Sequence, residues 1–86
     1  MNWELNLARA AQRALRTMPT RDRERITRAL DDMKSDPLTG DITVLRGEYS
    51  GLYRRRVGSW PIIFALKTDR RAVLVGDIVR RTSRTY

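Results

Sequence analysis

The chain has 86 residues, of which 18 are Lys or Arg and 10 are Asp or Glu, so its formal net charge is +8. It contains no cysteine and no histidine, which excludes disulfides, thiolate chemistry and imidazole catalysis and argues against a conventional zinc site. A chain this short builds one hydrophobic core, so we expect a single domain over residues 1–86 without a metal or a cofactor. The basic excess is almost all arginine and predicts a polyanionic or acidic partner.

The sequence carries no pattern of a membrane or secreted protein. No stretch approaches 18 apolar residues, and the N-terminus lacks the basic start and apolar run of a signal peptide. We therefore expect a cytoplasmic protein that does not contact a membrane.

The first third of the chain predicts one strand and two helices. Trp3, Leu5 and Leu7 alternate with polar residues, which predicts a half-buried strand over residues 2–7. From Ala8 the apolar residues recur every three or four positions, as in an amphipathic helix that ends near Met18-Pro19. The helix arginines fall outside this apolar stripe, on a face that we expect to be solvated: Arg9, Arg13, Arg16, Arg21, Arg23, Arg25 and Arg28.

A second helix is predicted to begin after Thr20, which suits an N-cap, and to end near Ser35-Asp36, because Pro37 disfavours helical geometry in the residue before it. Strands follow at residues 43–45, 52–57, 60–67 and 72–79. Short turns between consecutive strands favour antiparallel pairing. The predicted class is α+β: an N-terminal strand and an antiparallel two-helix hairpin packed on a mainly antiparallel sheet of three to four strands.

Several short motifs stand in a characteristic order along almost the whole chain. They are Trp3 to Leu7 with the helix Ala8 to Leu15, Arg25-Ile26, Asp36-Pro37, Leu45-Arg46-Gly47, Tyr53 to Gly58, Trp60 to Phe64, Ile78-Val79-Arg80-Arg81, and Tyr86. This series resembles the RelE/ParE superfamily of small bacterial toxins from type II toxin–antitoxin systems, and we favour its RelE-like branch.

The resemblance implies two alternative targets. RelE-like toxins are endoribonucleases that enter the ribosomal A site, cut the mRNA there and so inhibit translation, whereas ParE-like toxins inhibit DNA gyrase by binding it. Both kinds are neutralised by a cognate antitoxin, here expected to be acidic, which commonly also binds the DNA of the operon. A third reading is a domain of this fold that binds nucleic acid or a partner and has lost the activity.

The strand over residues 52–57 carries the first candidate site residues. Side chains alternate along a strand, so Arg54 and Arg56 share one face while Tyr53, Arg55 and Val57 share the other. Arg54 and Arg56 match the basic active-site positions of the family, and we expect them to bind phosphate and stabilise the transition state. The family has an apolar residue at Arg55, so that side chain either reaches the sheet edge or pairs with an acid.

The C-terminal tail carries the other candidates. Tyr86 is the one tail side chain able to move a proton, and the nearby arginines favour its phenolate. The resemblance places a catalytic arginine shortly before such a tyrosine, and both Arg80 and Arg81 fit that position. We expect Arg46 and Arg84 to bind RNA, because either can substitute for a missing cation.

That missing cation is the main departure from the family pattern. After the Gly58-Ser59 turn the family has an aromatic residue followed by an arginine, but this chain has Trp60-Pro61. Pro61 has neither charge nor backbone N–H, so it cannot contact phosphate, and its strand should lie at an edge of the sheet or begin there. Tyr86 favours the nuclease, whereas Pro61 favours the gyrase inhibitor or the inactive domain.

Overall fold

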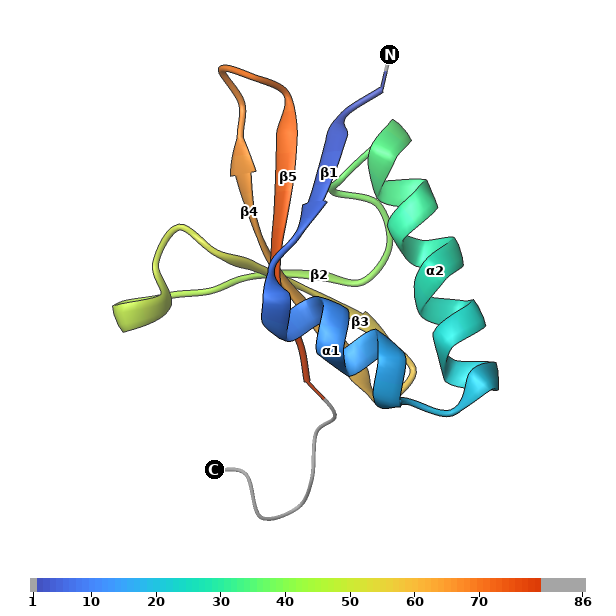
Figure 1. The fold of residues 1–86 in the computed structure, drawn as a ribbon. Coiled ribbons are helices and arrows are strands. Elements are labelled where there is room, and N and C mark those ends of the chain that lie inside the picture. Colours follow the sequence, from blue (N-terminus) through green and yellow to red (C-terminus); the bar gives the residue numbers. More distant parts are fainter. Residues whose placement is uncertain (1, 80–86) are drawn as a thin grey trace.

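The computed structural model describes residues 2–79, which form a five-stranded sheet with two helices on one of its faces (Figure 1). The strand order is β1-β5-β4-β3-β2, with β1 parallel to β5 and all other neighbours antiparallel. The α+β class is confirmed. The sheet has more strands than expected because the N-terminal strand joins it as an edge. The strands are β1 (Glu4–Leu7), β2 (Ile42–Val44), β3 (Tyr53–Val57), β4 (Trp60–Lys67) and β5 (Ala72–Ile78).

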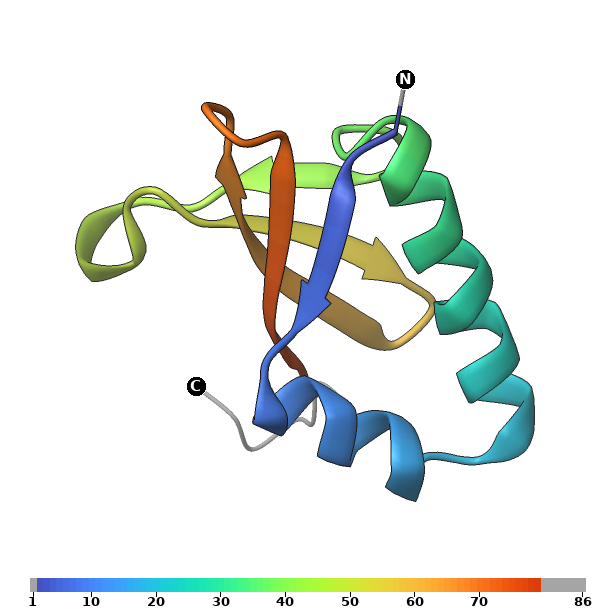
Figure 2. The same cartoon turned by 45° about the horizontal axis from the view of Figure 1, so that its top comes forward.

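The helices α1 (Arg9–Thr17) and α2 (Thr20–Ser35) diverge from the short link between them, so each packs on the sheet separately (Figure 2). Thr20, the predicted N-cap, is instead the first residue of α2, and Pro19 precedes it without a side-chain cap. The helix still ends at Ser35, ahead of Pro37. In the described residues no helix is both long enough and apolar enough to cross a membrane.

Arg23 is a structural residue and not part of the solvated helix face, contrary to our expectation. Its guanidinium donates to the carbonyl oxygens of Leu15 at 2.8 Å and Met18 at 3.0 Å, and to that of Arg16 at 3.4 Å. These carbonyls belong to the C-terminal end of α1 and its link, where a helix leaves acceptors unpaired and favours positive charge. Arg23 therefore fixes the path from α1 into α2.

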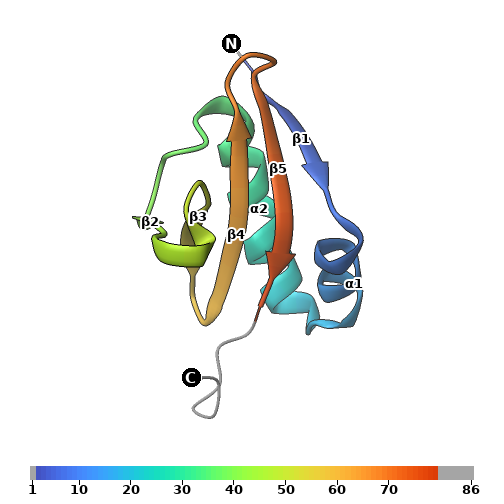
Figure 3. The ribbon, with the colours of Figure 1, turned by 90° about the vertical axis from the view of Figure 1, so that its left-hand side faces the viewer.

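The core lies between the helices and one face of the sheet. Both tryptophans are half-buried and pack against it, as the strand pattern of their neighbours predicts, and the Arg71 guanidinium lies 5.2 Å from the Trp3 ring centre. The fully buried large side chains come from α2, β4 and β5: Ile26, Met33, Ile62, Phe64, Val73, Val75 and Ile78. The opposite face of the sheet carries no α-helix of residues 2–79 (Figure 3), and we call it the open face.

A β-bulge in β5 changes which side chains reach each face. Ile63 pairs with Asp77 while the next residue, Phe64, pairs with Val75, so Gly76 is the extra residue. One extra residue reverses the alternation of a strand. Val75 and Ile78 are therefore both buried against the helices, and Asp77 lies on the open face opposite Ile63.

Candidate nucleic-acid interface

The arginines of β3 are divided between the two faces of the sheet. Tyr53 and Val57 pack against the core, and the side chain of Arg55 reaches α2 on the same face. Arg54 and Arg56 lie on the open face, because side chains alternate along the strand. The expected alternation is confirmed, and it places Arg54 and Arg56 on the face of the sheet opposite to Arg55.

Arg54 and Arg56 are available to a ligand. Arg54 is half-buried and Arg56 is exposed. Within residues 2–79 the ion pairs are Lys34 with Asp31 and Arg55 with Asp32, so neither open-face arginine is neutralised there. Two unpaired guanidiniums of the same sign, two residues apart on one strand face, repel each other and gain when an anion binds between them.

The open face also brings a carboxylate near these cations. Across the sheet, Arg54 pairs with Ile63 and Ile63 with Asp77, so all three side chains lie in one row. Asp77 is half-buried, and one of its oxygens accepts the Ile78 N–H at 2.8 Å. Asp77 was not among the predicted site residues, although a single acid inside an otherwise apolar strand was a visible signal.

The described chain ends in the same row of the sheet as Arg56, with β4 between them. The Val79 N–H donates to the Pro61 carbonyl oxygen at 3.1 Å, and Pro61 is the cross-strand partner of Arg56. Pro61 is the second residue of β4, which lies between β3 and β5, so the edge position is wrong and the strand begins one residue before it. The remaining predicted residues of the tail lie outside the described residues: Arg80, Arg81, Arg84 and Tyr86.

Arg46 lies at the tip of the hairpin that joins β2 to β3, away from Arg54 and Arg56. The tip projects from the sheet on the side opposite the helices (Figure 1) and contains a short 3₁₀ helix, Gly47–Tyr49. Tyr49 is 54% exposed and its N–H donates to the Arg46 carbonyl oxygen at 3.3 Å. This exposed aromatic residue was not predicted, and its signal in the sequence was its place between two glycines.

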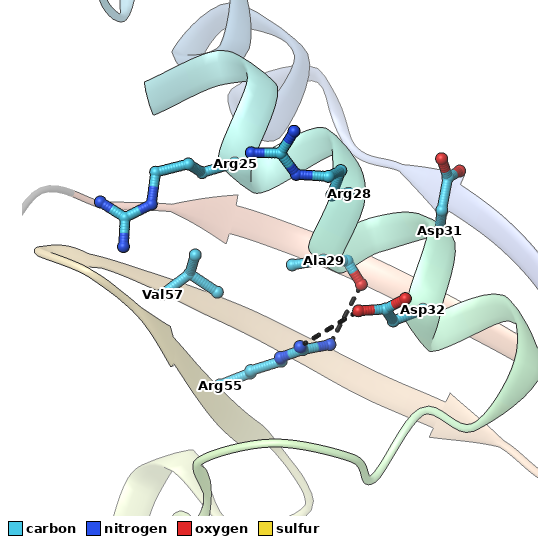
Figure 4. Close-up of a pocket in the computed structure, with 7 residues that line it drawn as sticks. All are labelled: Arg25, Arg28, Ala29, Asp31, Asp32, Arg55 and Val57. Carbon is cyan, nitrogen blue, oxygen red and sulfur yellow. Dashed lines mark hydrogen bonds and ion pairs between the residues drawn. The ribbon is translucent and has the colours of Figure 1, made fainter. Parts of the chain in front are cut away.

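Arg55 joins β3 to α2 on the helix face (Figure 4). Its Nη1 donates to the Ala29 carbonyl oxygen at 3.1 Å, and its Nη2 lies 3.7 Å from an Asp32 carboxylate oxygen. Only 12% of its side chain is exposed. Gly40, at φ +88°, lies so close that a Cβ there would be 2.8 Å from the Arg55 Nε. The expectation that Arg55 pairs with an acid is therefore confirmed.

A pocket of about 380 Å³ opens beside this contact, between α2 and β3. It lies on the helix face of the sheet, so the sheet separates it from Arg54 and Arg56. Its walls carry charges of both signs and its floor is apolar (Figure 4). The lining residues are Arg25, Arg28, Ala29, Asp31, Asp32, Arg55 and Val57.

Solved structures of known proteins resemble the whole described fold. The toxin–antitoxin complex RelBE2 from Mycobacterium tuberculosis contains a chain that matches with a TM-score of 0.85 at 20% identity, over 94% of this chain and 100% of that one. A chain of the RelE–RelB complex from Pyrococcus horikoshii matches with a TM-score of 0.83 at 20% identity, over 96% and 99%. The YoeB/ParE toxin from Agrobacterium tumefaciens matches with a TM-score of 0.79 at 15% identity, over 92% of this chain and 99% of that one.

Sequence comparison adds no further assignment: neither a family model nor a curated protein matches. The structural likeness extends over nearly the full length of both chains in each comparison. The chain therefore has the RelE/ParE toxin fold, as the ordered motifs of its sequence implied.

Proposed function

We propose that this protein is the toxin of a toxin–antitoxin system and a metal-independent, ribosome-dependent mRNA endonuclease. The observation that carries the proposal is the pair of unneutralised arginines on the open face, Arg54 and Arg56. Arg56 lies in the same row of the sheet as Val79, the last described residue, after which the sequence continues toward Arg80, Arg81 and Tyr86. The fold shared with RelE and YoeB toxins supports the same assignment, and a ribosomal target places the protein in the cytoplasm.

In the proposed reaction the 2′-oxygen of one nucleotide attacks the adjacent phosphorus. The bond from phosphorus to the 5′-oxygen breaks, giving a 2′,3′-cyclic phosphate and a free 5′-hydroxyl. Arg54, Arg56 and Arg80 or Arg81 stabilise the negative charge that builds on the phosphoryl oxygens, since a guanidinium keeps its proton at any usable pH. Arg46 and Arg84 bind the RNA in this proposal.

The reaction also needs a group that takes the proton of the 2′-hydroxyl and one that returns a proton to the 5′-oxygen. Tyr86 handles one of these protons in our proposal. Asp77 is a second candidate, because it is a carboxylate in the same row of the open face as Arg54. No metal enters this scheme.

The test is to express the wild type and Tyr86→Phe and to map mRNA 5′ ends. We expect cuts in phase with codons in the wild type and their loss in Tyr86→Phe. Wild-type protein that arrests growth with intact mRNA would contradict the nuclease assignment.

Pro61 supports a second candidate function, inhibition of DNA gyrase by protein binding. It lies opposite Arg56, where the family pattern leads us to expect a further cation, and it offers no charge to an RNA phosphate. A gyrase supercoiling assay with purified protein separates the two functions. Inhibited supercoiling with uncut mRNA would favour the ParE-like activity, and neither effect would favour the inactive binding domain.

The proposed partners follow from the same assignment. The M. tuberculosis and P. horikoshii structures are complexes of a toxin with an antitoxin, RelB in the latter. We infer a cognate antitoxin for this chain, acidic because the chain is strongly basic. Binding to operator DNA would then occur through the antitoxin.

A further inference from the structure

The pocket between α2 and β3 holds two arginines that no described acid neutralises. Asp32 pairs with Arg55 at 3.7 Å and Asp31 with Lys34 at 3.5 Å, so both acids of the lining already have a cation. Arg25 and Arg28 are exposed, and the hydrogen bonds and ion pairs of residues 2–79 include neither side chain. The pocket is thus short of negative charge.

The local backbone keeps these two arginines at the pocket mouth. They are three residues apart on α2, and residues at that spacing are neighbours on a helix surface. The Arg25 guanidinium lies over the turn after β3, where a Cβ on Gly58 would be 3.4 Å from its Nη1. The glycine, at φ +62°, leaves space for it. Figure 4 shows Arg25 and Arg28 at the same side of the pocket, away from the bond between Arg55 and Ala29.

The remaining lining decides which anion fits. Ala29, only 4% exposed, and half-buried Val57 form an apolar floor. Asp31 and Asp32 belong to the wall, so a chain of phosphates passing along it would meet two negative charges. A single carboxylate placed between the two arginines avoids both acids, while an adjacent apolar side chain covers the floor. These features favour a peptide over a nucleic acid.

We propose that this pocket receives an aspartate or glutamate side chain of the antitoxin, with an apolar neighbour of that residue on the floor. The inference rests on the proposed function, because it assigns a place to the partner that the function requires. Since the sheet separates the pocket from Arg54 and Arg56, this contact anchors the antitoxin without occupying the RNA face. A mutation in the pocket can then weaken binding of the antitoxin without changing how the open face binds RNA.

The experiment measures binding of the purified protein encoded by the neighbouring reading frame, by calorimetry. The test variant is Arg25→Glu/Arg28→Glu and the matched control is Arg9→Glu/Arg13→Glu on α1, which changes the net charge equally at exposed sites. We expect Kd to rise at least about 30-fold in the test variant and less than about 3-fold in the control. A native-like circular dichroism spectrum and a cooperative thermal transition establish that both variants fold.

A second measurement reverses the charges. Each acidic residue of the partner is changed to lysine in turn, and we expect one such change to restore binding to Arg25→Glu/Arg28→Glu. Wild-type affinity in the test variant, or equal losses in both double variants, would overturn the pocket assignment while leaving the toxin proposal intact. A test variant that keeps its affinity but no longer cuts mRNA would instead make the pocket an RNA contact. Absence of binding by the wild type would defeat both proposals.

Discussion

At the scale of single residues, Arg54 and Arg56 differ from Arg55 through strand alternation alone. Arg54 and Arg56 lie on the open face without an acidic partner in the described part of the chain. Arg55, between them, contacts Asp32 and the Ala29 carbonyl oxygen on the other face. The sequence predicts this division, since it depends only on period-two geometry. The acid that holds Arg55 is not predictable in the same way, because it lies on an element distant in sequence.

The first prediction concerns Arg54 and Arg56. Replacing either by glutamine removes a cation from the transition state but keeps a side chain of similar length, and we expect mRNA cleavage to slow about 100-fold. Single-turnover cleavage on programmed ribosomes measures the effect. Arg70→Gln, an exposed arginine in the turn between β4 and β5, is the matched control and should cleave at the wild-type rate.

Asp77 gives a second prediction at this scale. If its carboxylate takes the proton of the 2′-hydroxyl, Asp77→Asn should lower the cleavage rate about 100-fold with little change in ribosome affinity. Asp69→Asn, in the exposed turn, controls for the lost charge. Equal rates for wild type and Asp77→Asn would assign proton transfer to other groups.

Asp77 also illustrates what the sequence does not specify. Simple alternation from Val73 and Val75 places Asp77 toward the core, and only the extra residue Gly76 turns it to the open face. A bulge depends on how two strands pair, which a single strand does not encode. The candidate site could therefore be predicted at β3 but not at β5.

At the scale of elements, the junction of α1 and α2 depends on one side chain. Arg23→Ala would leave three carbonyl oxygens near the end of α1 without their donor. We expect the free energy of unfolding to fall by about 1.5–3 kcal/mol. Chemical denaturation measures it, with exposed Arg21→Ala as a control expected within about 0.5 kcal/mol of wild type.

The contact between β3 and α2 supports a fourth prediction. Arg55→Ala removes both the bond to Ala29 and the partner of Asp32, and we expect a loss of about 1–3 kcal/mol in unfolding free energy. Arg55→Met should lose less, because an apolar chain of similar length fills the same space and the family has an apolar residue here. Two equal losses would show that packing contributes nothing at this position.

At the scale of the whole molecule, the excess of positive charge opposes the folded state. Arg9 and Arg13 lie one turn apart on α1, a helix that contains no acid. Raising sodium chloride from about 0.05 M to about 0.5 M screens this repulsion, and we expect Tm to rise by about 2–4 °C. The variant Arg9→Gln/Arg13→Gln should start at a higher Tm and gain less. An equal rise in Tm for the wild type and the variant would show that the salt effect comes from charges other than Arg9 and Arg13.

The architecture was predictable to the extent that it rests on local patterns. Both α-helices and all strands of the described chain were expected within two residues of their observed ends, because amphipathic periods, proline and glycine are local signals. The 3₁₀ helix Gly47–Tyr49 was not expected. The pairing of β1 with β5 was not, since the two strands lie near opposite ends of the chain. For Arg55 the pairing with an acid was predicted but the acid was not, because Asp32 lies on an element distant in sequence. The role of Arg23 was missed because its acceptors are backbone carbonyl oxygens, which a side-chain pattern does not show.

The parallel pairing of β1 with β5 has a consequence for synthesis of the protein. Glu4 is made long before Ala72, the residue with which it pairs across the two strands. Contacts between such distant residues form late and slow the folding of small domains. Until then α1 lacks β5, the strand against which it packs, and the core cannot close. A ribosome that makes this protein therefore completes β5 before any folded copy of that chain exists to act.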